Sequence, residues 1–183
     1  MLGPPRQRQL VARIPSPGRV LGRSRAFALV ALACLTLAGC DEQALDPGHG
    51  PGAAARVTRH TDGDTLWLSG IGKVRLIGID TPEVFGEAEC YGPAASAFVK
   101  RVAPLGSKVR YRLGIEERDR YGRALAYVWL RDGRLLNRLI LLRGYGEPLT
   151  IPPNVEYGAE FERAGAKARA AGRGMWGRRG CTG

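Results

Sequence analysis

The stretch 62–83 constrains the fold most, because two short β-type runs lie there between two acidic turns. The runs are 65–68 and 73–79, and a glycine-rich turn joins them. If the runs pair as a hairpin or meander, both acidic turns can lie at one end of the sheet. The sequence therefore predicts that Asp64 and Asp80 converge.

These residues suit the hydrolysis of a phosphodiester. Two carboxylates and a backbone carbonyl form a hard oxygen site for Ca²⁺ or a similar cation, and such an ion neutralises charge on an attacked phosphate. Arg75 lies between the aspartates, and a guanidinium binds phosphate through two parallel hydrogen bonds. Glu83 follows the second turn, and such a carboxylate can orient a water or take its proton. The alternative is that the acidic residues only form turns.

The length and charge of the chain set broad limits. Its 183 residues suit one domain with extensions, and its formal net charge is +11. Residues 1–40 hold six arginines and no acid, so the remainder has 22 basic and 17 acidic residues, or +5. A modest positive charge favours an anionic partner without identifying it.

The N-terminal segment has the pattern of an export signal. The apolar run 26–35 follows Arg23 and Arg25 and is shorter than a membrane span of about 20 residues. It leads to Leu-Ala-Gly-Cys at 37–40, which resembles the lipobox of bacterial lipoproteins. We therefore expect 1–40 to be a lipoprotein-type signal peptide with Cys40 lipidated. The alternatives are a plain signal peptide and an uncleaved anchor.

This signal predicts where the protein acts. The first ~20 residues exceed what a signal needs, so we expect the translation start to lie downstream. Residues 41–55 are rich in Asp, Pro, Gly and Ala and predict a flexible tether. We expect a membrane-anchored lipoprotein that faces the periplasm or the cell exterior, a folded domain at 56–176 and a C-terminal tail at 177–183. No protein partner is expected, and the chain is expected to be a monomer.

Periodicity predicts five strands and three helices within the folded domain. The expected strands are 56–60, 65–68, 73–79, 108–113 and 124–130. The expected helices lie between Gly92 and Pro104, over 135–143 and over 157–171. His60, at the end of the first strand, is expected to have a surface role rather than a catalytic one.

Four segments occur in the order found in one protein family: 62–65, 75–83, 91–98 and 119–127. With them, the region 56–176 resembles the staphylococcal nuclease (thermonuclease) family. The resemblance implies an α+β fold, a five-stranded OB-type β-barrel with three helices. It also implies a Ca²⁺-dependent endonuclease that hydrolyses single-stranded DNA and RNA and leaves 3′-phosphates.

The resemblance assigns a calcium site to the two acidic turns. Asp64 and Asp80 match the calcium carboxylates of the family. Thr81 matches the residue whose backbone carbonyl completes the protein ligands. Asp62 matches an acidic residue that supports these ligands without binding the ion.

The resemblance also assigns residues to the substrate. Arg75 and Arg123 match the two phosphate-binding arginines. Glu83 matches the glutamate that acts on the attacking water as general base or orienter. Arg120 and Tyr121 match residues that contact the terminal phosphate of the nucleotide.

The sequence departs from the family pattern in two places. The family's archetype has a Tyr-x-Tyr pair where this chain has 147–154, a stretch without an aromatic residue. Stacking on a base contributes about 1–3 kcal/mol, so affinity and base preference are affected more than the chemistry. The loop 84–90 is shorter than in the archetype and acidic.

A second functional class is a non-catalytic OB-fold module that binds nucleic acid or protein. Family relatives of that kind have lost the acidic and arginine residues. The five key side chains are all present here, which favours the enzyme; they are Asp64, Arg75, Asp80, Glu83 and Arg123.

Cys90 and Cys181 remain after the signal is removed. An exported protein can hold a disulfide, so we predict that these cysteines pair and tie the C-terminal tail to the barrel. The alternative is two free thiols. Two cysteines without a nearby histidine do not suit a zinc site.

Overall fold

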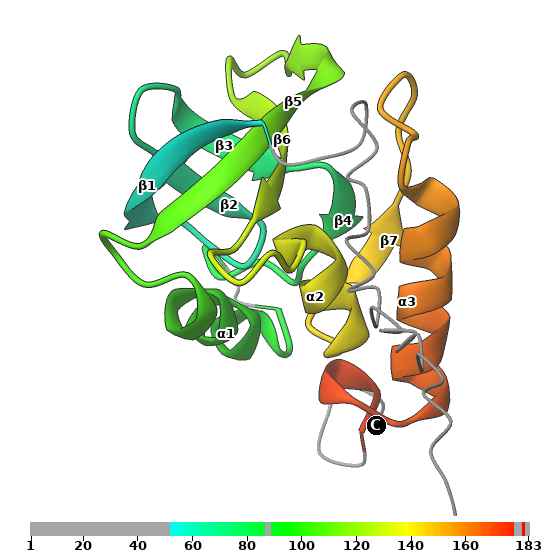
Figure 1. Ribbon diagram of the computed structural model, residues 1–183. Helices are drawn as coiled ribbons and strands as arrows, with labels where there is room; N and C mark the ends of the chain where they lie inside the picture. Colours follow the sequence, from blue (N-terminus) through cyan, green and yellow to red (C-terminus); the bar gives the residue numbers. More distant parts are fainter. Residues whose placement is uncertain (1–51, 87–88, 178–180, 182–183) are drawn as a thin grey trace, which may run out of the picture. The chain divides into compact units, whose positions relative to one another are not determined.

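The computed structural model describes residues 52–86, 89–177 and 181 of the chain (Figure 1). The predicted signal peptide, with its predicted lipidation site Cys40, and residues 41–51 of the predicted tether lie outside these residues. Among the described residues, none of the helices has both the length and the apolar character needed to cross a bilayer.

Five strands close into a barrel in the order β1-β2-β3-β6-β5 (Figure 1). The pairing of β3 with β6 is parallel, and the other pairings are antiparallel. This confirms the predicted five-stranded barrel. Its strands are β1 Ala53–His60, β2 Thr65–Leu68, β3 Gly72–Leu76, β5 Lys108–Arg118 and β6 Ala124–Trp129.

Three α-helices accompany the barrel and confirm the α+β class. They are α1 Gly92–Val102, α2 Leu136–Leu142 and α3 Gly158–Ala170, and a short 3₁₀ turn, η1 Gly174–Trp176, follows. Helix α2 packs against both β6 and α3. Its Asn137 is fully buried, accepts the N–H of Val128 and donates to the carbonyl of Ile77, so the helix is fixed to the barrel wall.

The predicted strand 73–79 was wrong as one element, because the chain bends after Leu76. Gly78 has a φ of 78°, a conformation that favours glycine, and a Cβ there would lie 2.5 Å from the ring of Phe161. The chain leaves the barrel and forms β4 (Gly78–Asp80), which pairs antiparallel with β7 (Glu147–Leu149). Strand β7 lies in the stretch 147–154, where no strand was predicted.

Two barrel strands are longer than predicted. Strand β1 begins at Ala53, which pairs with Tyr111 of β5, so the last three residues of the predicted tether belong to the barrel. Strand β5 extends to Arg118, with a register shift against β6 after Leu113. The prediction of this strand rested on a strict alternation of residues over 108–113, and this alternation ends where the register shifts.

A disulfide joins Cys90, just before α1, to Cys181, after η1, with the two Cα atoms 5.6 Å apart. This confirms the predicted pairing and excludes the alternative of two free thiols. The bond closes a loop with a sequence separation of 91 residues. In the chain-entropy model, closing so long a loop strongly reduces the conformational entropy of the unfolded chain, which stabilises the folded state.

Replacing Cys90 and Cys181 together with serine should therefore lower the free energy of unfolding by about 3–5 kcal/mol. Chemical denaturation of the soluble domain, with and without reductant, measures the change. Reductant should destabilise the parent to the level of the double variant and leave the variant unaffected. Equal stability of parent and variant would contradict the prediction.

Candidate active site

The first acidic turn is built by Asp62. Its Oδ1 accepts the N–H groups of Asp64, at 3.0 Å, and Thr65, at 2.7 Å. Gly63 packs so closely that a Cβ would lie 2.8 Å from the hydroxyl of Thr81. Asp62 thus shapes the turn that directs Asp64 inward, as its predicted supporting role requires.

Asp64 is buried, with 6% of its surface exposed, and its carboxylate is surrounded by donors. Its Oδ1 accepts the hydroxyl of Thr65, at 2.9 Å. Its Oδ2 accepts both the backbone N–H of Thr81, at 3.0 Å, and the hydroxyl of Thr81, at 3.2 Å. The first acidic turn is therefore joined directly to the second, as predicted.

Arg75 lies between the two aspartates. Its Nη1 is 2.6 Å from Oδ2 of Asp64, and its Nη2 is 2.7 Å from Oδ1 of Asp80. Val74 and Leu76, its neighbours on β3, are buried in the core, so strand alternation directs Arg75 away from them. The structure thus brings Asp64, Asp80 and Arg75 into one cluster.

The buried position of Asp64 alters its acidity. Burial raises the pKa of Asp64 to about 7, against the lowering effect of the Arg75 guanidinium, and the nearby Asp62 carboxylate adds to the rise. Arg75 therefore offsets only part of the cost of burying this carboxylate. A further positive charge at the cluster would favour the ionised form.

A turn between β5 and β6 positions Arg123. Oδ1 of Asp119 accepts the N–H groups of Tyr121 and Arg123, both at 2.9 Å, and its Oδ2 lies 2.6 Å from Nε of Arg123. Burial alone would raise the pKa of Asp119, but these hydrogen bonds outweigh burial and lower it. Asp119 was not predicted as a site residue. Its place at the start of an Asp-x-x-Gly turn is the signal that was available.

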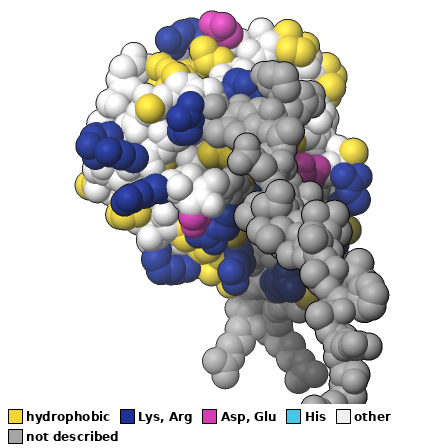
Figure 2. All heavy atoms as spheres, viewed as in Figure 1, with side chains coloured by type: hydrophobic (Ala, Val, Ile, Leu, Met, Phe, Trp, Pro, Cys, Tyr) yellow, Lys and Arg dark blue, Asp and Glu magenta, His cyan; other side chains and the backbone are white. Residues whose placement is uncertain are grey.

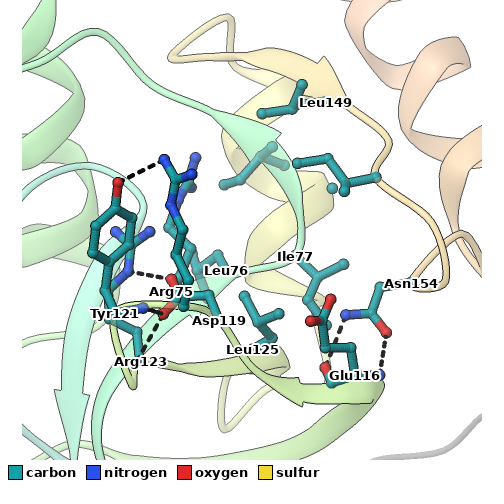
Figure 3. A pocket seen from close by; sticks show the side chains of 14 residues that line it. Arg75, Leu76, Ile77, Glu116, Asp119, Tyr121, Arg123, Leu125, Leu149 and Asn154 are labelled. Atoms are coloured by element: carbon teal, nitrogen blue, oxygen red, sulfur yellow. Dashed lines mark hydrogen bonds and ion pairs between the residues drawn. The ribbon is translucent and has the colours of Figure 1, made fainter.

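Arg75 and Arg123 line one pocket of about 540 Å³, so both can reach a common anion (Figure 3). Arg120 and Tyr121 line it too, and Nη2 of Arg120 donates to the Tyr121 hydroxyl at 2.7 Å. Four predicted substrate residues therefore meet at one cavity. Tyr121 is 68% exposed and lies at its rim.

The pocket has an aliphatic wall. Leu149 and Ile151 line it, and both come from the stretch 147–154 in which no aromatic residue was found. Leu125 of β6 lies on the same pocket. Among the described residues that line the pocket, Tyr121 is the one aromatic side chain, and its ring is a surface on which a base could stack.

Two further residues singled out from the sequence lie outside this pocket lining. Glu83 is exposed, and its backbone N–H donates to the carboxylate of Glu89 at 3.0 Å. His60 was expected at the surface, but both of its ring nitrogens are buried, which corrects that expectation. Burial and then the charge of Lys100 lower the pKa of His60, and both residues line a different hollow.

The donor set of the cluster fits a hard cation in its chemistry. Two carboxylates already share one positive group, the Arg75 guanidinium, and oxygen ligands of this kind suit Ca²⁺. No group of three or more His, Cys, Asp or Glu side chains within the described part of the chain could hold a metal alone. A calcium site here would need the carbonyl of Thr81 and water as further ligands.

The surface charge suits an anionic partner. Figure 2 shows lysine and arginine side chains spread over the described part of one face, with few acidic ones among them. Strand β1 and helix α1 contribute exposed Arg56, Arg59, Lys100 and Arg101 and contain no acidic residue. Such a surface attracts polyanions over a distance set by the salt concentration.

Comparisons with known proteins agree with this geometry. The family described as staphylococcal nuclease homologue matches residues 73–178. The thermonuclease of Staphylococcus intermedius is 37% identical over 131 residues, which are 68% of this chain and 77% of that protein. The thermonuclease of Staphylococcus hyicus is 36% identical over 127 residues, 66% of this chain and 74% of that protein. Endonuclease YhcR of Bacillus subtilis is 30% identical over 171 residues, which are 86% of this chain and only 14% of that protein.

The raised pKa of Asp64 predicts a pH dependence of stability. An unfolded aspartate titrates near ~3.9, so at higher pH the folded protein holds a proton that the unfolded chain has released. In metal-free buffer, the free energy of unfolding should fall as the pH rises from about 4 to about 7.

In the variant Asp64→Asn, the side chain of residue 64 cannot ionise, so the free energy of unfolding should not show this fall with pH. Urea unfolding at several pH values in EGTA measures both proteins. A fall of the same size in the variant would show that another group causes it.

Proposed function

The chain belongs to the staphylococcal nuclease family, and from this premise we propose that it is a calcium-dependent endonuclease. It would hydrolyse phosphodiester bonds of DNA and RNA and leave 3′-phosphate ends. The observation that carries the proposal is the Asp64–Arg75–Asp80 cluster beside a pocket that Arg75 shares with Arg123. The names of the thermonuclease relatives support nuclease activity.

The two arginines would bind the phosphate that is attacked. Each guanidinium can form two parallel hydrogen bonds to phosphate oxygens. Asp119 fixes Arg123 through its Nε, which leaves the two Nη groups to face the substrate. The positive charge of the guanidinium groups is thereby held where negative charge grows in the transition state. The arginine side chains need not rearrange as the reaction proceeds.

Asp64, Asp80 and the backbone carbonyl of Thr81 would hold the calcium ion. When bound, Ca²⁺ would polarise a phosphoryl oxygen and offset the charge that develops on it. Asp62 would keep Asp64 in place through the two hydrogen bonds of its turn. The raised pKa of Asp64 means that ion binding and loss of its proton are coupled.

Glu83 would orient the attacking water or accept its proton. It follows Asp80 by three residues, on the acidic turn that carries the proposed calcium ligands. The water oxygen would bond to phosphorus and lose a proton to Glu83 or to solvent, while the bond to the 5′ oxygen breaks and that oxygen takes a proton from solvent. The phosphate therefore stays on the 3′ oxygen. Arg120 and Tyr121, at the pocket rim, would contact a terminal phosphate.

Unpaired nucleic acid suits this pocket best. A base within a duplex is stacked and paired, whereas a base in a single strand can enter a side pocket. The exposed ring of Tyr121 and the aliphatic wall of Leu149 and Ile151 would contact such a base. The substrate class is therefore proposed to be single-stranded DNA and RNA.

Arg123→Ala and Glu83→Ala should each lower the rate of cleavage by about 100-fold or more while remaining folded. Cleavage of single-stranded DNA by the soluble domain in Ca²⁺ measures the rate, and EGTA should abolish it. End-group analysis should find 3′-phosphates. Arg131→Ala is the matched control, since Arg131 is exposed and lines a different hollow.

Full activity of both variants would refute these roles. A parent protein that binds DNA but does not cleave it in Ca²⁺ would instead identify a non-catalytic OB-fold module.

We also propose that the protein is exported and held at the membrane by a lipid on Cys40. The support is the sequence pattern of residues 23–40 alone. In a bacterial host, Cys40→Ser should move the protein from the membrane fraction to the soluble fraction and abolish labelling with a fatty-acid analogue. Cys34→Ser, in the apolar run, serves as the control and should change neither. Equal labelling of Cys40→Ser and parent would contradict the proposal.

A further inference from the structure

The pocket that holds Arg75 and Arg123 has opposite charges at its two ends. Figure 3 shows the arginines at one end and Glu116 of β5 at the other, with aliphatic side chains such as Leu125 between them. A carboxylate repels a phosphate, so the phosphate belongs at the arginine end. The Glu116 end then faces whatever part of the ligand lies farthest from the phosphate.

The backbone at Glu116 is held in place by Asn154. Oδ1 of Asn154 accepts the N–H of Glu116 at 3.1 Å, and its Nδ2 donates to the carbonyl of Glu116 at 2.9 Å. Asn154 is buried, and Gly114 packs so closely on it that any Cβ at residue 114 would overlap its side chain. Because both ends of the Asn154 amide bind the backbone, the carboxylate of Glu116 is the group that remains to contact a ligand.

We propose that Glu116 selects the base of the bound nucleotide by accepting a hydrogen bond from an exocyclic amino group. This inference rests on the proposed nuclease function and names the substrate preference of the same pocket. From one end to the other, the pocket presents arginines, an aliphatic wall and a carboxylate. A matching ligand has a phosphate at one end, an apolar flat ring in the middle and an amino group at the other end. A nucleotide with an amino-bearing base has this order of groups.

The chemistry separates cytosine from thymine at one position. Cytosine carries an N4 amino donor where thymine carries the O4 acceptor, and carboxylates accept from N4. At the same place, O4 of thymine would direct its lone pairs at a carboxylate that has no proton to donate. Glu116 therefore favours cytosine and opposes thymine, and uracil shares the carbonyl of thymine.

The test compares single-stranded oligodeoxycytidylate with oligothymidylate of equal length. Glu116→Gln offers an amide that both donates and accepts, so it should lower the ratio of kcat/KM for the two substrates by about tenfold, mainly through KM. Binding of both oligonucleotides in EGTA, measured by fluorescence anisotropy, should show the same change in the ratio of Kd values. Glu117→Gln is the matched control, because Glu117 is the exposed neighbour that does not line the pocket, and it should change neither ratio.

The outcomes separate this inference from the function on which it rests. If Glu116→Gln cleaves both oligonucleotides with the parent ratio, the role of Glu116 is wrong and the nuclease proposal stands. If the parent cleaves neither oligonucleotide in Ca²⁺, the nuclease proposal itself fails. An equal change in Glu116→Gln and Glu117→Gln would also overturn the inference, because it would show a general effect of charge.

Discussion

The contact on which the rest of the site depends is the guanidinium of Arg75, held between the carboxylates of Asp64 and Asp80. It joins three segments of the fold: the turn before β2, barrel strand β3 and the end of β4, which lies outside the barrel. Burial of Asp64 makes its charge costly, so the ionised form of the cluster depends on positive charge beside it. The same need for positive charge makes the cluster a suitable place for a cation, and a bound cation together with Arg75 and Arg123 would attract a phosphate.

The barrel provides this arrangement through two departures from regular structure. Gly78 lets the chain turn out of β3 at a place where any side chain would collide with Phe161. Asn137 then donates a hydrogen bond to the carbonyl of Ile77 at the bend, so this carbonyl is paired although the strand has ended at Leu76. Together they end the third barrel strand early and present Asp80 to Arg75.

Local patterns in the sequence predicted much of this, and non-local pairing explains most of what they missed. The run 65–68 and the helix from Gly92 were predicted correctly, because periodicity and a proline in the first turn are local signals. The pairing of β4 with β7 joins segments almost 70 residues apart, and three residues with a proline carry no strand pattern. For the site, turn chemistry predicted that the aspartates converge, and the Asp-x-x-Gly turn could have indicated Asp119, whereas Glu116 could be recognised only once Asn154 was placed beside it.

We propose that Asp64 and Asp80 together bind one divalent cation next to Arg75 and Arg123. Calorimetric titration of Ca²⁺ into the soluble domain, with a nucleoside 3′,5′-bisphosphate present, tests this without relying on cleavage. One ion should bind per chain, and Asp80→Asn should abolish binding while the fold persists, since the side chain of Asp80 is exposed. Unchanged Ca²⁺ binding in Asp80→Asn would contradict the claim.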